Sequence, residues 1–531
     1  MKLDRDLQSV QEVRELTYRA KQAQLEFKHF NQSQVDKIVK AMADAGYNES
    51  ERLAQMAFEE TGFGKPEDKK IKNQFATKDV YESIKDLKTV GVIEVSRNGK
   101  IVKIAEPMGV VAALIPSTNP TSTAMFKTII SLKCRNSIVC SAHPKALKST
   151  LESLRILREA AENAGAPKDL ILCMLTPTLE GTNALLKDEN TAIILATGSK
   201  PMVRAAYSSG HPAYGVGPGN VPAFIERSAN YKKAVADIIY GTTFDNGTLC
   251  SSEQSMIVDR PLLDSVISET EKNGGYFLSD EEKRKLESAV VKDGHINPEI
   301  VGKPAVWIAN YADFTVPENT KVLLAKCTKV GKEEPLSIEK LSPILSFYLV
   351  EGWLEGCHKC IELLHFGGVG HTMVLHSNDK EIIMKFALEK PAFRILVNTP
   401  SSVGAVGYTT ALNPSMTLGP GTWGGSIVSE NVTAHHLMNI KTLAFEEKPI
   451  NSGQSISSFE GSAQQTFSGI ESGFISQIEK NLLARAGNPK ISFNEQIKSK
   501  PFSENIAPKN KVLGTGISED EVQKIIRDFK F

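Results

Sequence analysis

Apolar residues recur three and four positions apart through the first 90 residues, with many Lys and Glu residues between them. This spacing places the apolar side chains on one face of a helix and the charged ones on the opposite face. The segment therefore predicts amphipathic helices with solvated polar faces. The first apolar stripe comprises Val10, Val13, Leu16 and Tyr18, and the second comprises Val35, Ile38, Val39 and Met42.

The pattern changes at Val90, where alternating or continuous apolar runs with glycine punctuation begin. Apolar strands separated by amphipathic helices indicate a parallel sheet covered on both faces, which is the α/β class. Such sheets bind ligands at the carboxyl ends of their strands, so we expect a nucleotide-sized crevice there. The predicted strands are 108–116, 136–142, 169–175 and 191–197, and the predicted helices are 123–134, 149–165 and 182–188.

A second α/β region begins near Ala229 and contains a run of small residues around one cysteine. The run FDNGTLCSSEQS places Gly247 before Cys250 and hydroxyl residues on both sides of it. A thiolate is a strong nucleophile toward carbonyl carbon, and a small-residue turn exposes such a sulfur to substrate. Neighbouring backbone N–H groups would then stabilise the oxyanion. The alternative is a buried, inert cysteine, because free cysteine is among the most buried residue types.

The length of 531 residues suggests two or three domains. Lys+Arg and Asp+Glu both total 62, so there is no global electrostatic attraction to nucleic acid or to membranes. The first twenty residues are charged throughout and lack an apolar signal core, and no apolar run is long enough to span a bilayer. We therefore expect a cytoplasmic protein.

The seven cysteines form an odd, scattered set, which favours reduced thiols over a disulfide framework. Cys357 and Cys360 form a C-x-x-C motif with His358 and His365 nearby, and zinc binding is the alternative interpretation. No second cysteine pair follows at zinc-site spacing, and the segment is typical of a helix. We therefore expect no metal site.

Gly198 and Ser199 lie between the last predicted strand of the first region and a predicted helix. The start of a helix binds phosphate through its backbone N–H groups and its dipole. An ordinary small-residue turn is the alternative, because no G-x-G-x-x-G motif accompanies the pair.

Residues from about 10 to 446 resemble the aldehyde dehydrogenase superfamily, and most of all its CoA-acylating branch, which includes one half of the bifunctional aldehyde/alcohol dehydrogenases. The stretches that carry the resemblance are IPSTNPTSTAMFKT, YGVGPGNVPAFIE, FDNGTLCSSEQSMIVD and PSMTLGPGTWGGSIVSENV, supported by EKLSP and GGVGHT. The resemblance implies two Rossmann-like, doubly wound parallel-sheet domains with a small oligomerisation element. The expected divisions are N-terminal helices with the NAD-binding domain (1–226), the catalytic domain (227–426), a strand that returns to the cofactor domain (427–446), a linker (447–516) and a terminal helix (517–531).

The family mechanism assigns roles to residues of this chain. Cys250 would attack the aldehyde carbonyl, and the side-chain amide of Asn119 with the Cys250 backbone N–H would stabilise the oxyanion. Hydride would pass to NAD and leave an acyl-enzyme thioester. His371 would help deprotonate the CoA thiol, or would hydrogen-bond to backbone instead. The residues implied in cofactor binding are Gly198, Ser199, Gly217, Pro218, Gly219, Glu339 and His143.

Asn119 and Glu339 each have a simpler interpretation, and the loop 217–220 departs from the pattern of the hydrolytic members of the superfamily. Asn119 alone is also a common turn residue, and Glu339 alone is also a common surface charge. Hydrolytic superfamily members carry a glutamate in a loop near the cysteine, but the matching loop here, residues 217–220, reads GPGN. Without that base a better nucleophile than water is needed, so we expect CoA to be the acyl acceptor.

We therefore expect a CoA-acylating, NAD-dependent dehydrogenase of a short aldehyde. Acetaldehyde is the first choice of substrate, with propionaldehyde and sulfoacetaldehyde as alternatives. The family is oligomeric, so we expect a homo-oligomer with strand exchange near residues 435–446. An acid-forming dehydrogenase and a non-catalytic cargo or scaffold protein are the rival functions.

The C-terminal residues after Pro449 are rich in Ser, Gly and Gln and are typical of a flexible linker. At the end of the chain, Ser518 and Glu521 form a capping box ahead of an apolar face that includes Ile525 and Phe529. The tail resembles the encapsulation peptides of bacterial microcompartment enzymes, which dock on shell or cargo proteins. The alternative is that the helix packs on its own enzyme or stabilises an oligomer.

Overall fold

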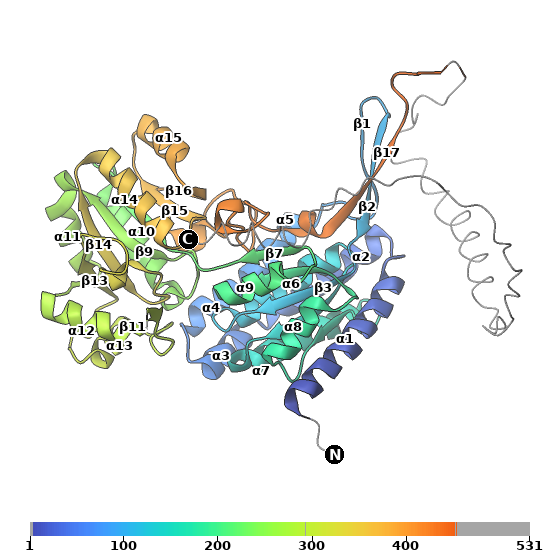
Figure 1. The fold of residues 1–531 in the computed structure, drawn as a ribbon, viewed down its shortest axis with the longest axis horizontal. Coiled ribbons are helices and arrows are strands. Elements are labelled where there is room, and N and C mark those ends of the chain that lie inside the picture. The colour runs from blue at the N-terminus through green and yellow to red at the C-terminus, as the bar shows by residue number, and fades with distance from the viewer. Residues whose placement is uncertain (1–3, 293, 452, 454–531) are drawn as a thin grey trace, which may run out of the picture. The chain divides into compact units, whose positions relative to one another are not determined.

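The structure is a computed structural model that describes residues 4–292, 294–451 and 453 (Figure 1). The predicted terminal helix, 517–531, and all but the first residues of the predicted linker lie outside the described residues. Three sheets of three or more strands, one two-stranded hairpin and the covering helices make up the part of the chain that is described.

The N-terminal segment is helical, as its apolar periodicity predicts. Asp4 caps the first helix, and Asn31 and Gln34 form a capping box at the second. Val13 and Leu16 are buried, but the prediction is wrong for Tyr18, which is 60% exposed. Tyr18 lies two residues after Leu16, a rotation of about 200° around the helix, so the two side chains face different ways. The helices are α1 (Arg5–Phe27), α2 (Gln32–Asn48), α3 (Ser50–Thr61), α4 (Pro66–Gln74), the π-helix η1 (Phe75–Asp79) and α5 (Val80–Ile84).

The first parallel sheet has five strands in the order β5-β4-β3-β6-β7. Alternate residues of its central strand pack into two different cores. Val111 lies in a core shared with α2, α6 and α7, and Val110 lies in one shared with α1, α8 and α9. Both faces are therefore covered, as predicted. The elements are β3 (Val110–Ile115), α6 (Pro120–Lys133), β4 (Ser137–Ala142), η2 (Pro144–Ala146), α7 (Leu147–Asn163), β5 (Ile171–Cys173), α8 (Leu179–Lys187), β6 (Thr191–Thr197), α9 (Lys200–Tyr207) and β7 (Ala213–Val216).

The second parallel sheet has seven strands in the order β10-β13-β14-β9-β8-β15-β16. It too is buried between two layers, because Met256 of β9 packs with α10 while Ile257 packs with α14. The strands are β8 (Val221–Ile225), β9 (Glu253–Asp259), β10 (Gly275–Phe277), β13 (Val322–Lys326), β14 (Ile344–Val350), β15 (Gly370–His376) and β16 (Ala392–Val397). The helices are α10 (Tyr231–Thr243), η3 (Phe244–Gly247), η4 (Arg260–Leu262), α11 (Leu263–Lys272), α12 (Asp280–Val290), α13 (Ala305–Tyr311), η5 (Pro335–Ser337), α14 (Gly352–Phe366), α15 (Lys380–Glu389), α16 (Ser401–Gly404), η6 (Thr422–Gly424) and η7 (Ala434–Leu437), with a small hairpin of β11 (Val291–Lys292) and β12 (His295–Ile296).

These two sheets confirm the predicted α/β fold with two parallel-sheet, Rossmann-like halves. The change from one sheet to the other falls between β7 and β8, so β8 belongs to the second sheet although the predicted boundary at 226 places it in the first domain. Among residues 4–292, 294–451 and 453, no helix is both long and apolar enough to cross a membrane.

The third sheet is antiparallel and joins distant parts of the chain (Figure 1). Its strands are β1 (Gly91–Ser96), β2 (Ile101–Pro107) and β17 (Met438–Ala444). Met438 pairs with Pro107 and Ala444 pairs with Ile101, so the chain returns to the strand that leads into β3. All residues of β17 after Met438 are exposed.

Candidate active site

The loops that leave the first sheet gather several predicted site residues at one edge. Asn119 follows β3, His143 follows β4, and Gly198 and Ser199 follow β6. Strand β3 lies between β4 and β6, and all three run parallel. The loops therefore leave the sheet where connections diverge to both sides, which is where open α/β sheets bind ligands.

The second sheet contributes residues at the opposite ends of its strands. Cys250 lies just before β9, His371 is the second residue of β15, and Glu339 lies shortly before β14. These are the amino ends of parallel strands. The predicted site residues of the first sheet thus lie at the carboxyl ends of its strands, and those of the second sheet at the amino ends.

A left-handed turn carries the chain into the Cys250 loop. Asp245, Asn246 and Gly247 have φ values of +48°, +51° and +73°, a conformation that costs free energy for residues other than glycine. Side-chain bonds offset that cost: the Asn246 amide donates to two backbone carbonyl groups at 3.0 and 3.2 Å. The Ser251 hydroxyl anchors the far side of the loop on the Ser402 carbonyl at 3.1 Å.

Cys250 differs from the other six cysteines because it is partly exposed whereas they are buried. Burial of its thiol, and to a smaller extent the Glu339 carboxylate, raises the pKa of Cys250 to about 12. The Arg394 guanidinium and the residue's own backbone N–H lower this pKa. The thiol is therefore protonated at neutral pH in the free protein, with two groups at hand that favour its thiolate.

The Asn119 amide faces the loop that carries Cys250. Its Nδ2 donates to the Thr248 carbonyl at 3.2 Å and to the Thr118 hydroxyl at 3.1 Å. Its Oδ1 accepts from Lys72 at 2.5 Å. The amide N–H groups therefore lie on the side of the cysteine loop, where an oxyanion formed at Cys250 would replace the Thr248 carbonyl or the Thr118 hydroxyl as their acceptor.

The 217–220 loop packs directly on the cysteine. A Cβ added to Gly219 would lie 2.1 Å from the Cys250 carbonyl oxygen, so only glycine fits there. The Gly219 N–H donates to Glu339 Oε1 at 2.9 Å. Burial raises the pKa of Glu339 to about 8, and this hydrogen bond opposes the rise. Glu339 is therefore largely protonated at neutral pH, unlike a solvated surface charge.

His371 is buried beside the same loop. Burial and the Arg394 charge lower the pKa of His371 to about 3, so the imidazole is neutral at physiological pH. Its Nδ1 lies 2.9 Å from the Thr372 hydroxyl. Its Nε2 is buried and has no hydrogen-bond partner among the described residues. A neutral ring with an unpartnered nitrogen can accept a proton.

The residues predicted to hold the dinucleotide fit a phosphate-bearing ligand. Ser199 occupies the N-cap of α9, and no side-chain capping bond is made there among the described residues. Pro201 in the first turn has no N–H, so the N–H groups of Lys200 and Met202 are the ones that α9 offers to an anion. His143 is exposed after β4, where its Nδ1 accepts from the Lys145 N–H at 3.1 Å.

Sequence reasoning missed Arg394 and Lys72. Arg394 is 3% exposed on β16 and donates to the carbonyl groups of Gly419 and, at 3.4 Å, His371. It supplies the positive charge that is missing from the 244–255 run. The signal that was available is an arginine inside the apolar strand AFRILV.

The C-x-x-C motif lies on α14, as a helix was predicted there. Cys357 and Cys360 are both buried, and Cys357 contacts the Lys390 ammonium group. In the part of the chain that the structure describes, no group of three or more His, Cys, Asp or Glu side chains is placed to hold a metal ion.

Comparison with known proteins places this geometry in a family. The profile of the aldehyde dehydrogenase family matches residues 6–274. The chain is 45% identical over 441 residues to the bifunctional aldehyde-alcohol dehydrogenase AdhE of Escherichia coli (strain K12), covering 82% of this chain and 50% of that protein. It thus spans about half the length of that curated relative.

Two solved structures resemble it over nearly their whole length. One is an acetylating aldehyde dehydrogenase from Geobacillus thermoglucosidasius, 51% identical with a TM-score of 0.84, covering 85% of this chain and 100% of that one. The other is a propionaldehyde dehydrogenase from the Clostridium phytofermentans fucose utilisation bacterial microcompartment, 28% identical with a TM-score of 0.73, covering 81% and 96%. The chain therefore belongs to the aldehyde dehydrogenase family, beside its acetylating members.

Proposed function

We propose that this protein oxidises a short aliphatic aldehyde with NAD and transfers the acyl group to coenzyme A. The observation that carries the proposal is the surroundings of Cys250. A partly exposed thiol lies between an amide donor, Asn119, and a loop, residues 217–220, that has no acid–base side chain.

The residues of the chain divide the reaction among them. The Cys250 thiol loses its proton to solvent, its sulfur bonds to the carbonyl carbon as the C=O π bond breaks, and the carbonyl oxygen becomes an oxyanion that accepts from Asn119 Nδ2 and the Cys250 N–H. NAD supplies the hydride acceptor. We place it on the carboxyl edge of the first sheet, with Gly198 and Ser199 at the pyrophosphate and Glu339 near the nicotinamide ribose. The loop 217–220 and His143 complete that proposed site.

The thioester that remains on Cys250 needs a second nucleophile. The nearby loop offers no carboxylate, and its Asn220 amide is already committed to the carbonyl groups of Ser337 and Leu363 at 2.9 and 3.0 Å. Water therefore lacks a carboxylate base in this loop, whereas a thiol needs far less activation. His371 is proposed to take the proton of the CoA thiol at its unpartnered Nε2. The CoA sulfur then replaces the Cys250 sulfur on the acyl carbon.

Acetaldehyde is the proposed substrate, with propionaldehyde and sulfoacetaldehyde as alternatives. The acetylating dehydrogenase from Geobacillus thermoglucosidasius supports a two-carbon acyl group, and the propionaldehyde dehydrogenase from Clostridium phytofermentans supports a three-carbon one. We also propose a homo-oligomer built through β17, because this strand lies at the edge of its sheet with exposed side chains.

The direct test is NADH formation from acetaldehyde with and without CoA, for the wild type and for Cys250→Ala. We expect turnover that depends on CoA and is lost in the variant. Turnover indifferent to CoA would point to acid formation, the rival enzyme activity. A folded protein inert with every short aldehyde would favour a cargo or scaffold role.

We further propose that residues 517–531 direct the enzyme into a bacterial microcompartment in the cytoplasm. The support is the capping box and apolar face of this segment, together with a similar protein whose source is a microcompartment. The test fuses 447–531 to a fluorescent protein in cells that make shells. We expect the fluorescence to lie in the shells. Fluorescence outside the shells, together with aggregation or loss of the oligomer when residues 447–531 are removed from the enzyme, would favour packing of the helix on the enzyme itself.

A further inference from the structure

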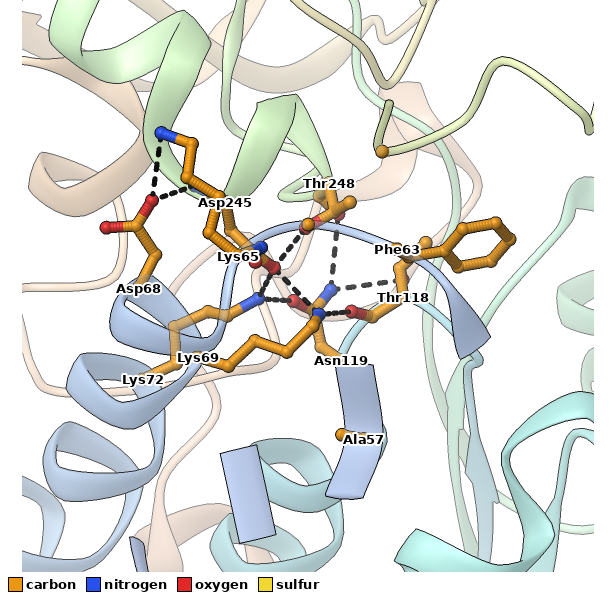
Figure 2. A network of polar contacts seen from close by, with 12 residues as sticks. Ala57, Phe63, Lys65, Asp68, Lys69, Lys72, Thr118, Asn119, Asp245 and Thr248 are labelled. Atoms are coloured by element: carbon orange, nitrogen blue, oxygen red, sulfur yellow. Dashed lines mark hydrogen bonds and ion pairs between the residues drawn. The ribbon is translucent and has the colours of Figure 1, made fainter. Parts of the chain in front are cut away.

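A buried cluster of charged side chains contacts Asn119 and includes Asp245 of the turn before Cys250 (Figure 2). The side chains of Lys69, Lys72 and Asp245 are 2%, 5% and 0% exposed. The two lysines project from α4, and Asp245 belongs to the left-handed turn before Cys250. Charged residues so fully removed from water are rare unless they are paired.

Asp245 is fully occupied by its neighbours. Its Oδ2 accepts from Lys69 at 3.0 Å, from Lys72, and from the Thr248 hydroxyl at 2.6 Å. Its Oδ1 accepts from the Lys65 backbone N–H at 2.7 Å. Burial would raise the pKa of Asp245, but the two lysines and the Thr248 hydroxyl together lower it by more than burial raises it. The carboxylate is therefore ionised.

One carboxylate cannot neutralise two ammonium groups. Asp68, which is nearby, is paired with Lys65 at 3.3 Å, so the three buried side chains keep one excess positive charge. Burial lowers the pKa of Lys72 to about 8, with Asp245 opposing this shift. Lys72 is thus mostly charged at neutral pH, and its remaining bond goes to Asn119 Oδ1 at 2.5 Å.

That bond decides which way the Asn119 amide points. An ammonium group only donates, so the amide oxygen must face Lys72. The Nδ2 group is then directed to the Thr248 carbonyl and to Thr118 (Figure 2). A flipped amide would place N–H against N–H and oxygen against the Thr248 carbonyl. Lys72 therefore holds the Asn119 amide in the orientation in which its N–H groups point toward the Cys250 loop.

The surrounding elements hold Lys72 in place. Asn73, the next residue of α4, is buried, accepts from the Thr121 hydroxyl at 2.7 Å and donates to the Ser50 carbonyl at 2.9 Å. Thr121 lies in the first turn of α6, two residues after Asn119. A π-helix, η1, follows α4 directly, and such segments are often found at functional sites.

We propose that Lys72 is a positioning residue for the oxyanion site: it fixes the Asn119 amide, and the excess positive charge of its cluster strengthens the amide N–H as a donor. This inference rests on the proposed function, in which an oxyanion forms when Cys250 attacks a carbonyl. A purely structural role for the cluster would affect every reaction of Cys250 alike. An oxyanion role affects only reactions that pass through an oxyanion.

The test therefore compares two reactions of the same thiol in the full-length protein. With p-nitrophenyl acetate, a C–S bond forms through a tetrahedral oxyanion and p-nitrophenolate leaves. With iodoacetamide, the sulfur displaces iodide at a saturated carbon and no oxyanion forms. In Lys72→Met we expect acylation to slow by about 10-fold or more and alkylation to stay within about 2-fold. Lys70→Met is the matched control, because Lys70 is on the same helix but is exposed and pairs with Glu51.

A double-mutant cycle with Asn119→Ala asks whether Lys72 acts through the amide. In the Asn119→Ala background, Lys72→Met should cost little further acylation, because the group that it positions is gone. Additive losses, equal losses in both reactions, or no loss would overturn the proposal. Should Lys72→Met not fold, Lys72→Gln keeps a donor for Asn119 without the charge. A slowing confined to acylation is again expected, and any other pattern would contradict it.

The same assay separates this inference from the proposed function. If Cys250→Ala reacts with p-nitrophenyl acetate as fast as the wild type, Cys250 is not the nucleophile and the proposed function fails. If acylation requires Cys250 but is unaffected by Lys72→Met, only the positioning role fails.

Discussion

The groups around Cys250 shift the pKa of its thiol in opposite directions. Burial holds the thiol protonated, the Glu339 carboxylate adds to this above about pH 8, where it is ionised, and Arg394 favours the thiolate. Because the other six cysteines are buried, a thiol reagent reports on Cys250 almost alone. The balance of these charges can therefore be measured directly.

Replacing Glu339 with Gln should make Cys250 more reactive to alkylation. The substitution removes a negative charge that disfavours the thiolate, so the pKa of Cys250 should fall. We expect alkylation by iodoacetamide at pH 9 to be faster by roughly 3- to 10-fold, equivalent to half to one pKa unit. Unchanged or slower alkylation would show that Glu339 does not act on the thiol.

His371→Gln should separate the two halves of the reaction. In the proposed mechanism, acyl-enzyme formation does not need the imidazole, whereas deprotonation of the CoA thiol does. We expect the first turnover of NADH to be nearly unchanged in a rapid-mixing experiment and the CoA-dependent steady rate to fall by about 100-fold. The pKa of His371 is about 3, so its protonation should not limit the wild type above about pH 5. Equal loss in both phases would exclude this division of roles.

The residues that sequence reasoning found and missed differ in a physical way. Cys250 and Asn119 lie in motifs that are recognisable in a stretch of sequence. Lys72 contacts Asn119, which is 47 positions away, and Arg394 contacts His371, which is 23 positions away. Such pairings depend on how helices and strands pack, which no local pattern specifies.

At the scale of elements, the 217–220 loop and the cysteine loop share one close backbone contact. Gly219→Ala should disturb that contact, because its Cβ would lie 2.1 Å from the Cys250 carbonyl oxygen. We expect kcat/KM to fall by about 100-fold, the size of effect that a 1 Å displacement of a catalytic group produces. Gly217→Ala, whose Cβ meets no atom within 4 Å, should have the smaller effect. Equal effects would contradict the packing argument.

The start of β9 contains a second buried carboxyl group. Glu253 Oε1 accepts from the N–H of Ser401, the first residue of α16. Its Oε2 is buried and has no partner among the described residues. Burial raises the pKa of Glu253 to about 8. Between about pH 4 and pH 8 the native state keeps a proton that the unfolded state has released, so stability falls as pH rises through this window.

Glu253→Gln should remove that pH dependence. The amide keeps the Oε1 acceptor and stays neutral, so the variant should gain stability over the wild type progressively from pH 5 to pH 8. The gain should level off above pH 8, at on the order of a few kcal/mol. Apparent melting temperatures across pH 5–9 measure it. A difference that does not change with pH would show that Glu253 is ionised in the folded protein.

The order of helices and strands in the first sheet is predictable from its apolar runs, because each buried strand lacks polar alternation. The position of the site in the second sheet is not predictable from the apolar runs. Cys250 and His371 lie at the amino ends of their strands, against the general rule for parallel sheets. The rule describes a single sheet, whereas this site lies where the carboxyl edge of one sheet meets loops that enter the other.

A few long-range contacts join the carboxyl edge of the first sheet to the loop that carries Cys250. Asn119 of the first half reaches Thr248 of the second, and β17 returns the chain to β2. Composition and charge set the class of protein, and the motifs indicate its family. The tail, 454–531, lies outside the described residues, so its targeting role stays a proposal.

The central claim is that Cys250 carries an acyl group that CoA, and not water, removes. Peptide mass spectrometry after mixing the protein with NAD and acetaldehyde, first without CoA and then with it, tests this claim most directly. We predict one acetyl group on the peptide that contains Cys250, stable without CoA and lost within one turnover once CoA is added. An unmodified Cys250, or an acetyl group that disappears equally fast without CoA, would contradict the account.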